Sequence, residues 1–143
     1  MATNIKTVLY VEDEESDRFF MELAFTKEGL ERALQTVEDG QDAIDYLQGN
    51  GNYSDRVQHP IPCLILLDMN LPEVPGLEVL RWVRSNPDYK SLPVVVFSSS
   101  LREEDKRDAK ALGADEFWQK PNSGSRFVEV INALSKRWPL SVQ

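Results

Sequence analysis

The feature that most constrains the fold is the alternation of two kinds of apolar segment along the chain. Short apolar runs, such as LILL at 64–67 and VVVF at 94–97, are separated by segments whose apolar residues recur at helical spacing. Near-continuous apolar runs of this length are typical of strands that are buried on both faces of a parallel sheet. We therefore predict an α/β domain in which five strands alternate with five helices that cover both faces of the sheet.

Turn-forming and capping residues place the boundaries of these elements. Ser16 or Asp17 is a suitable N-cap for the first helix, and Gly29 is a natural end of it. The turn-rich segment 49–62 is long for a connection in a compact α/β domain, which predicts that it is either functional or mobile. Pro139 ends the last helix. We expect strands at 7–11, 33–39, 63–68, 93–99 and 116–119, and helices at 16–28, 40–48, 76–86, 102–113 and 125–137.

Length and composition limit the classes of protein to which the chain can belong. Its 143 residues suit a single domain, with a core at about 6–137, a short tail at 138–143 and no output domain. No apolar stretch approaches the roughly 20 residues of a membrane-spanning helix, and the N-terminus is unlike a signal peptide, so we expect a cytoplasmic protein without membrane partners. A net charge of −8 argues against non-specific binding to nucleic acid. One cysteine, Cys63, and one histidine, His59, exclude an internal disulfide and the usual zinc clusters.

Charged and polar side chains stand where four of the predicted strands end. Because the carboxyl ends of parallel strands meet at one edge of the sheet, where ligands of such folds bind, we expect these side chains to converge. Three of them are carboxylates, which cannot all be ionised at close range without a counter-cation. The residues are Glu12, Asp13, Asp68, Ser98 and Lys120.

A hard divalent cation would neutralise the charge of these carboxylates. Mg²⁺ takes oxygen ligands and keeps several waters, so one or two carboxylates and a backbone carbonyl suffice to bind it. Lys120 offers a second positive charge, and Ser98 offers a hydroxyl that can donate a hydrogen bond. Since a carboxylate can act as a nucleophile through an acyl-phosphate, this set of groups is typical of a site that accepts a phosphoryl group.

Each of these groups alone also fits an ordinary structural role. The acidic run at 12–14 fits a solvated loop, and Lys120 fits a surface lysine. Asp68 fits a turn residue or an N-cap, and Ser98 fits the N-cap of the following helix. What favours a site is the joint placement of these residues at four strand ends.

In combination, four motifs make the chain resemble a two-component response-regulator receiver domain over residues 6–137. The motifs are VEDE at 11–14, LILLDMNLPEVPG at 64–76, PVVVFSSS at 93–100 and ALGADEFWQKP at 111–121. The resemblance implies a flavodoxin-like (βα)5 fold, with a doubly wound five-stranded parallel sheet in the order 2-1-3-4-5. It also implies a phosphoacceptor switch and not a turnover enzyme, one that takes a phosphoryl group from a histidine kinase and hydrolyses it slowly.

The roles of the family's residues carry over to the matching positions of this chain. Asp68 would accept the phosphoryl group, and Ser98 would bind one of its oxygens. Lys120 would pair first with Asp68 and then with the phosphoryl group, and the Lys120–Pro121 peptide bond would be cis. The resemblance implies that Mg²⁺ is held by Glu12, Asp13, Asp68 and the backbone carbonyl of Asn70.

The resemblance further predicts how the signal leaves the site. The added charge would draw Ser98 inward, and Phe117, where the family most often has Tyr or Phe, would move into the vacated space. A plain core aromatic is the alternative for Phe117. The surface formed by 102–113, 116–119 and 125–137 would then change. The partners implied are a sensor histidine kinase or a phosphotransfer protein, and a downstream protein target.

Two further features bear on partners. The segments 49–62 and 80–99 resemble those of stand-alone receivers that partner cyanobacterial phytochromes. For a homodimer, Trp138 and Leu140 near the end of the chain are the best candidates for an exposed contact, whereas the apolar residues of the last helix suit the core.

Three other functions fit the sequence less well. A phosphate-independent interaction module with a vestigial site is expected to lack one of the strand-end residues, and this chain has them all. Metal-dependent phosphohydrolases with an aspartyl nucleophile usually carry a second aspartate two positions on, where this chain has Asn70. Flavodoxin-like cofactor binding needs a phosphate loop after the first strand, where the acidic residues 12–15 would repel an anion.

Overall fold

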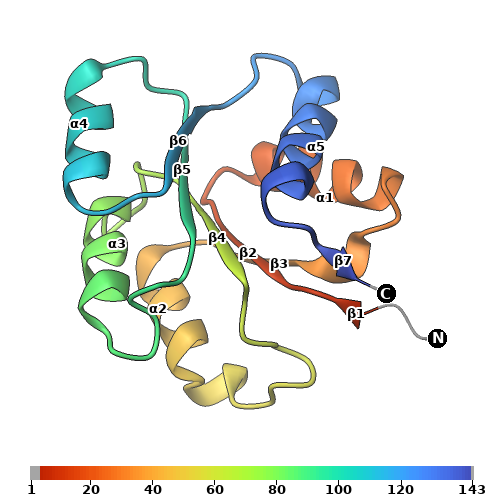
Figure 1. The fold of residues 1–143 in the computed structure, drawn as a ribbon, viewed down its shortest axis with the longest axis horizontal. Helices are drawn as coiled ribbons and strands as arrows, with labels where there is room; N and C mark the ends of the chain where they lie inside the picture. The colour runs from red at the N-terminus through yellow and green to blue at the C-terminus, as the bar shows by residue number, and fades with distance from the viewer. Residues whose placement is uncertain (1–3, 143) are drawn as a thin grey trace.

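The five-stranded sheet that the sequence predicts is present in the computed structural model, which describes residues 4–142. Its strands are β2 Val8–Val11, β3 Leu34–Val37, β4 Leu64–Leu67, β5 Val94–Ser98 and β6 Glu116–Gln119. All neighbouring strands are parallel, in the order β3-β2-β4-β5-β6. Counted along these five strands, the order is 2-1-3-4-5, so the predicted flavodoxin-like fold is confirmed (Figure 1).

Helices cover both faces of this sheet, as a doubly wound connection requires. Those of the described chain are α1 Glu15–Lys27, α2 Gly40–Gln48, α3 Gly76–Ser85, α4 Glu103–Ala111 and α5 Phe127–Arg137. Helices α1 and α5 lie side by side on one face, whereas α2, α3 and α4 lie on the other (Figure 1).

The two faces of the sheet bury separate apolar clusters. Every residue of β2 and β4 is buried, because neighbouring strands and the two helical layers enclose them. On the side of α1 and α5, Phe97 packs edge-on against Phe127, with the ring centroids 6.0 Å apart. On the other side, Leu47 of α2 and Val83 of α3 join the second cluster. Each such side chain contributes about 1.5–3 kcal/mol on burial, so the clusters fix the strands and hence the positions of their ends.

The helix ends follow the expected chemistry at some positions and not at others. Gly29 and Gly49 have φ angles of 70° and 72° after α1 and α2, a conformation that glycine adopts without steric penalty. The expected N-cap at Ser16 or Asp17 is wrong, because α1 already begins at Glu15. Asp17 therefore lies inside the first helical turn, and its carboxylate contacts another part of the chain.

The turn-rich segment 49–62 is tied to the end of α2. Arg56 donates hydrogen bonds to the carbonyl oxygens of Tyr46 and Leu47, both at 2.8 Å. These carbonyls belong to the last turn of the helix, where backbone acceptors lack intrahelical partners. The hydroxyl of Tyr46 in turn donates to the carbonyl of Pro60 at 2.8 Å. The segment therefore has a structural role, that of a cap for α2, which the sequence does not predict.

The C-terminal segment does not trail away from the domain. Strand β7, Ser141–Val142, pairs antiparallel with β1, Asn4–Ile5. Leu140 is 1% exposed and belongs to the core cluster of α1 and α5, while Trp138 is half-buried, with its ring 6.5 Å from that of Trp118. The expectation of an exposed contact is therefore wrong for Leu140, because burial within the domain removes its side chain from water, whereas Trp138 keeps part of its surface exposed.

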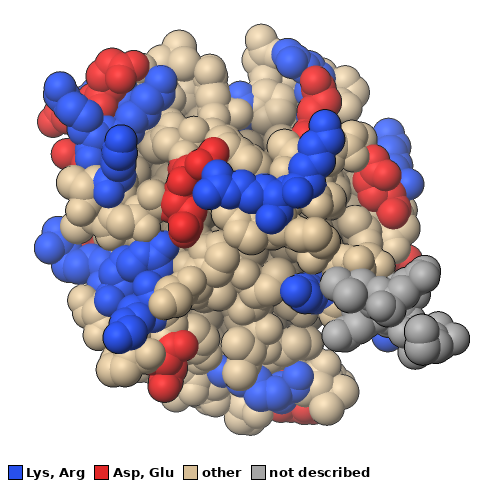
Figure 2. Space-filling model, in the orientation of Figure 1, with Lys and Arg blue, Asp and Glu red and all other residues tan. Residues whose placement is uncertain are grey.

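The surface shown in Figure 2 carries basic and acidic side chains close together. Over α4 they include the ion pairs Arg102–Glu104 and Lys106–Glu103. Exposed pairs of this kind contribute little to stability, typically below about 1 kcal/mol each, so the fold depends on apolar burial. Within residues 4–142, no helix combines the length and the apolar character needed to cross a membrane.

Candidate functional site

The carboxyl ends of β2 and β4 place two acidic residues next to each other. Glu12 and Asp68 directly follow these strands. The backbone N–H of Asp68 donates to the carbonyl of Val11 at 3.1 Å, and that of Glu12 donates to the carbonyl of Val37 at 3.0 Å. Sheet hydrogen bonding therefore continues one residue past the strands and fixes both acidic residues. We call this edge of the sheet the rim, and its residues are Glu12, Asp13, Asp68, Ser98 and Lys120.

Three carboxylates converge at the rim. Glu12, Asp13 and Asp68 each offer one ligand oxygen, and these oxygens lie within 4.8 Å of one another. Glu12 is fully buried and Asp68 is 3% exposed, whereas Asp13 is exposed. Oxygen donors at this spacing suit a hard divalent cation, which takes carboxylate ligands and keeps waters on its open side. The donor set therefore fits a metal ion such as Mg²⁺.

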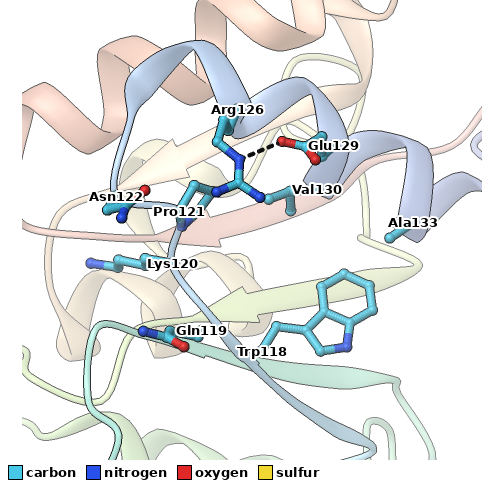
Figure 3. Close-up of a pocket in the computed structure, with 9 residues that line it drawn as sticks. All are labelled: Trp118, Gln119, Lys120, Pro121, Asn122, Arg126, Glu129, Val130 and Ala133. Atoms are coloured by element: carbon cyan, nitrogen blue, oxygen red, sulfur yellow. Dashed lines mark hydrogen bonds and ion pairs between the residues drawn. The ribbon is translucent and has the colours of Figure 1, made fainter.

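The ammonium group of Lys120 faces these carboxylates. Nζ of Lys120 lies 2.6 Å from Oε1 of Glu12, 2.9 Å from Oδ2 of Asp17 and 3.7 Å from Oδ2 of Asp68. The side chain is 9% exposed and extends away from the indole of Trp118 (Figure 3). Asp68 is thus the most distant of the three partners, beyond the usual length of an N–H···O hydrogen bond.

Asp17 is a partner of Lys120 that the sequence interpretation missed. Its carboxylate accepts a hydrogen bond from an ammonium group 103 positions away in the chain. A signal was available, because α1 starts at the rim and its first turn must lie beside the strand ends. Treating Asp17 as an N-cap assigned its carboxylate to the backbone of its own helix and so concealed this contact.

The crowding of charge at the rim shifts two pKa values. Burial raises the pKa of Glu12, the hydrogen bond from Lys120 lowers it and the charge of Asp68 raises it, and together they move this pKa from its ordinary 4.5 to about 7. Burial lowers the pKa of Lys120, but the hydrogen bond to Glu12 and the charge of Asp68 raise it above its ordinary value overall. Lys120 is therefore a cation at neutral pH, and Glu12 takes up a proton more readily than an exposed glutamate does.

Three further hydrogen bonds hold Glu12. The hydroxyl of Tyr10, buried in the core, donates to Oε1 at 3.1 Å, and the backbone N–H of Glu14 donates to Oε2 at 3.3 Å. Arg18 donates to the backbone carbonyl of Glu12 at 2.8 Å. Burial and the charge of Glu12 raise the pKa of Tyr10, so its hydroxyl remains a donor. Contacts of this kind fix the orientation of a carboxylate that serves as a ligand.

The backbone around Asp68 leaves no room for a side chain at Gly76. A Cβ at this position would lie 2.0 Å from the carbonyl oxygen of Asp68 and 2.8 Å from Cα of Met69. The glycine that ends LPEVPG is therefore required for the close approach of α3 to the rim. Asn70 is exposed beside it, and its backbone N–H donates to Oδ1 of Asp68 at 3.3 Å.

Ser98 and Phe117 lie on the strands beyond β4. Ser98 is fully buried at the end of β5, its Oγ accepts from the backbone N–H of Ser100 at 3.1 Å, and it does not cap α4. Its carbonyl accepts from the backbone N–H of Lys120 at 2.8 Å, which joins the ends of β5 and β6. Phe117 is half-buried on β6 and borders a cavity of about 320 Å³ that residues of α4 also line.

The peptide bond between Lys120 and Pro121 is trans, which corrects the expected cis bond. The trans form is intrinsically favoured before proline, by about 0.5–1 kcal/mol. Pro121 follows β6 and borders a groove of about 490 Å³ between this strand and α5, which Trp118 and Arg126 also line (Figure 3).

Comparison with known proteins agrees with this geometry. The sequence pattern of the response regulator receiver domain matches residues 8–132. The response regulator Rcp1 of Synechocystis sp. is 32% identical to the chain over 133 residues, which cover 93% of the chain and 88% of Rcp1.

Two solved structures are similar along nearly the whole chain. The crystal structure of the phosphorylated cyanobacterial phytochrome response regulator RcpA aligns with a TM-score of 0.85 and 32% identity, over 94% of each chain. The Mn²⁺-bound form of Rcp1 aligns with a TM-score of 0.82 and 31% identity, over 96% of this chain and 97% of Rcp1. The chain belongs to the response regulator receiver domain family of two-component systems.

Proposed function

We propose that Asp68 is the residue on which this chain accepts the phosphoryl group that response regulators receive from histidine kinases. The observation that carries the proposal is the setting of Asp68, an almost fully buried carboxylate with two others close by and an ammonium group at 3.7 Å. A carboxylate in this setting needs nearby cations, and a phosphoryl group in transfer needs the same cations.

In this reaction a carboxylate oxygen of Asp68 attacks the phosphorus atom of the donor's phosphohistidine. The new O–P bond forms as the P–N bond breaks, and the electron pair of that bond stays on the imidazole nitrogen. A carboxylate nucleophile has no proton to lose, so the chain needs no general base for this step. What it must supply is positive charge around the transferring oxygens.

We assign the metal site of this receiver to the rim carboxylates and to the backbone carbonyl of Asn70. Glu12, Asp13 and Asp68 already bring three oxygen donors together, and receiver domains bind a divalent metal. A relative solved in a Mn²⁺-bound form supports the assignment. When bound, Mg²⁺ would neutralise charge on the phosphoryl oxygens. Asp13, the exposed member of the set, gives the ion access from solvent.

After transfer, Lys120 and Ser98 would hold the phosphoryl group. It adds a charge of about −2 beside the ammonium of Lys120, and Ser98 offers a buried hydroxyl that is tied to Lys120 through the backbone. Phe117 would respond to the movement of Ser98, because it borders the cavity between β6 and α4. The surface of α4, β6 and α5 would then change its affinity for a downstream protein target.

The donor protein would dock beside the rim on α1. Phe19 and Leu23 of this helix are 56% and 41% exposed. Neighbouring exposed apolar side chains of this size mark a surface suited to protein contact. The similarity to RcpA and Rcp1 favours a phytochrome-type sensor histidine kinase as the donor, with a phosphotransfer protein as the alternative.

The direct test is incubation with acetyl phosphate and Mg²⁺, followed by intact-protein mass spectrometry. We expect the wild type to gain the mass of one phosphoryl group and Asp68→Asn to remain unmodified. Asp55→Asn is the matched control, because Asp55 is exposed in the loop that precedes β4, at the other end of that strand. A folded wild type that binds Mg²⁺ and keeps its original mass would contradict the proposal.

A further inference from the structure

We infer that Asp17 is a positioning residue, which holds the ammonium group of Lys120 in place for phosphoryl transfer to Asp68. The inference rests on the function proposed above. It starts from a contact between two elements distant in the chain, because Asp17 in the first turn of α1 accepts a hydrogen bond of 2.9 Å from Lys120 after β6.

The number of donors on the ammonium group matches the number of carboxylates around it. An ammonium group has three N–H donors. Glu12 at 2.6 Å and Asp17 at 2.9 Å lie within hydrogen-bond distance of Nζ, whereas Asp68 lies at 3.7 Å. Two anchors fix the position of the nitrogen atom, and one donor is left for Asp68 or for a phosphoryl group on it.

The two anchors differ in whether they have a second role. Glu12 belongs to the carboxylates that fit a metal ion, so a bound cation would compete with Lys120 for its oxygens. Asp17 lies outside that set of ligands. It is therefore the anchor that Lys120 would keep when the proposed metal site is filled, the state in which transfer would take place.

Asp17 is itself held in place by the residue that follows it. Arg18 donates to the backbone carbonyl of Glu12 at 2.8 Å and pairs with Glu38, just after β3, at 3.0 Å. These contacts fasten the first turn of α1 to the ends of two strands. The side chain of Asp17 is 24% exposed, so the pair with Lys120 is partly shielded from water.

A simpler role for Asp17 makes a different prediction. Acidic residues in a first helical turn stabilise the helix through its dipole, whatever else they contact. Glu15 lies in the same turn and is exposed. Glu15→Gln therefore removes the same charge from the same end of α1 and leaves the ammonium contact intact, which makes it the matched control for Asp17→Asn.

The test measures phosphorylation by acetyl phosphate at saturating Mg²⁺. In this reaction an oxygen of Asp68 bonds to phosphorus as the P–O bond to the acetyl group breaks, and acetate leaves with the electron pair. We expect Asp17→Asn to lower the maximal rate constant about tenfold, less than the roughly 100-fold that a misplacement of about 1 Å can cost. We expect Glu15→Gln to stay within about twofold of the wild type, and Asp17→Glu to recover part of the loss.

Two further measurements separate positioning from other roles. Calorimetric titration of the unphosphorylated protein should show at most a small change of Mg²⁺ affinity in Asp17→Asn, and a large loss would make Asp17 a metal ligand and overturn the inference. In a Lys120→Met background, Asp17→Asn should cause no additional slowing. Equal rate constants for Asp17→Asn and the wild type would overturn this inference alone, whereas an unmodified wild type would overturn it together with the proposed function.

Discussion

Replacing Lys120 by methionine removes the positive charge that three carboxylates share and keeps an unbranched side chain of similar length. The ammonium lies 2.6 Å from the fully buried Glu12, 2.9 Å from Asp17 and 3.7 Å from Asp68. Removal of one partner from a buried ion pair costs about 3–5 kcal/mol, because the other charge is left uncompensated. We expect Lys120→Met to lower the free energy of unfolding of the metal-free protein by that amount at about pH 8, or the Tm by about 10 °C.

The size of this loss depends on pH because Glu12 can take up a proton. Its pKa is about 7 in the fold and 4.5 ordinarily, so between these values the folded protein binds more protons than the unfolded chain, and stability falls as the pH rises. The full difference corresponds to about 3 kcal/mol. The hydrogen bond from Lys120 lowers the pKa of Glu12, so the loss of this bond in Lys120→Met raises the pKa further. The pH range over which stability falls then extends to higher pH. The variant should differ least from the wild type near about pH 5, where Glu12 is protonated in both proteins.

Urea unfolding in EDTA, followed by circular dichroism between about pH 5 and about pH 8, measures these differences. The matched control is the double variant Lys120→Met with Glu12→Gln, which removes one carboxylate together with the ammonium. We expect it to recover about half of the loss at about pH 8, and Mg²⁺ to recover part of the loss in the single variant. An equal loss at both ends of the pH range, or a loss below about 1 kcal/mol at about pH 8, would refute the idea that Lys120 neutralises the rim.

Three further substitutions test single contacts. Tyr10→Phe removes only the hydroxyl that donates to Glu12 at 3.1 Å, so we expect calorimetry to show an Mg²⁺ affinity reduced about tenfold. An unchanged affinity would mean that Tyr10 does not orient Glu12 for metal binding. Gly76→Ala places a Cβ 2.0 Å from the carbonyl oxygen of Asp68, and we expect urea unfolding to show a loss of about 3 kcal/mol; a neutral result would contradict the close approach. Arg56→Ala leaves two carbonyls of α2 without their donor, so we expect the free energy of unfolding to fall by about 2 kcal/mol. Hydrogen exchange in segment 49–62 should become faster, and exchange at the wild-type rate would show that Arg56 does not anchor this segment.

The sheet could be predicted because its central strands carry their own signal. LILL and VVVF have no polar face, so only a position buried on both sides accommodates them, and a parallel sheet between helices provides it. The pairing of β1 with β7 could not be predicted, since it involves two residues on each strand and no periodic pattern. The burial of Leu140 likewise depends on the space beneath α1 and α5, which exists only after those helices have packed.

The convergence of residues at the rim could be predicted from the topology of the sheet. Which of them form ion pairs could not, because it depends on side-chain length and direction. Strand ends alone bring Glu12, Asp68 and Lys120 together. Which carboxylate lies nearest the ammonium depends on the length of the lysine and on the direction of α1, and neither is encoded in a spacing of residues. For this reason Asp68, the expected partner of Lys120, is the farthest of the three carboxylates from its ammonium group. Asp17, which the sequence interpretation assigned to a helix cap, lies closer, at 2.9 Å.

Glu12 links the ammonium group of Lys120 to the proposed metal site. One of its oxygens accepts from both Tyr10 and Lys120, and the same carboxylate belongs to the set that fits a metal ion. Under the proposed function, metal binding and the position of the ammonium are therefore coupled, because both cations draw on one carboxylate. If a bound cation drew on Glu12, Lys120 would keep Asp17 and would remain beside Asp68, where a phosphoryl group would need its charge. The inferred role of Asp17 is to limit how far the ammonium would move, so that Lys120 would stay beside Asp68 when the metal site is filled.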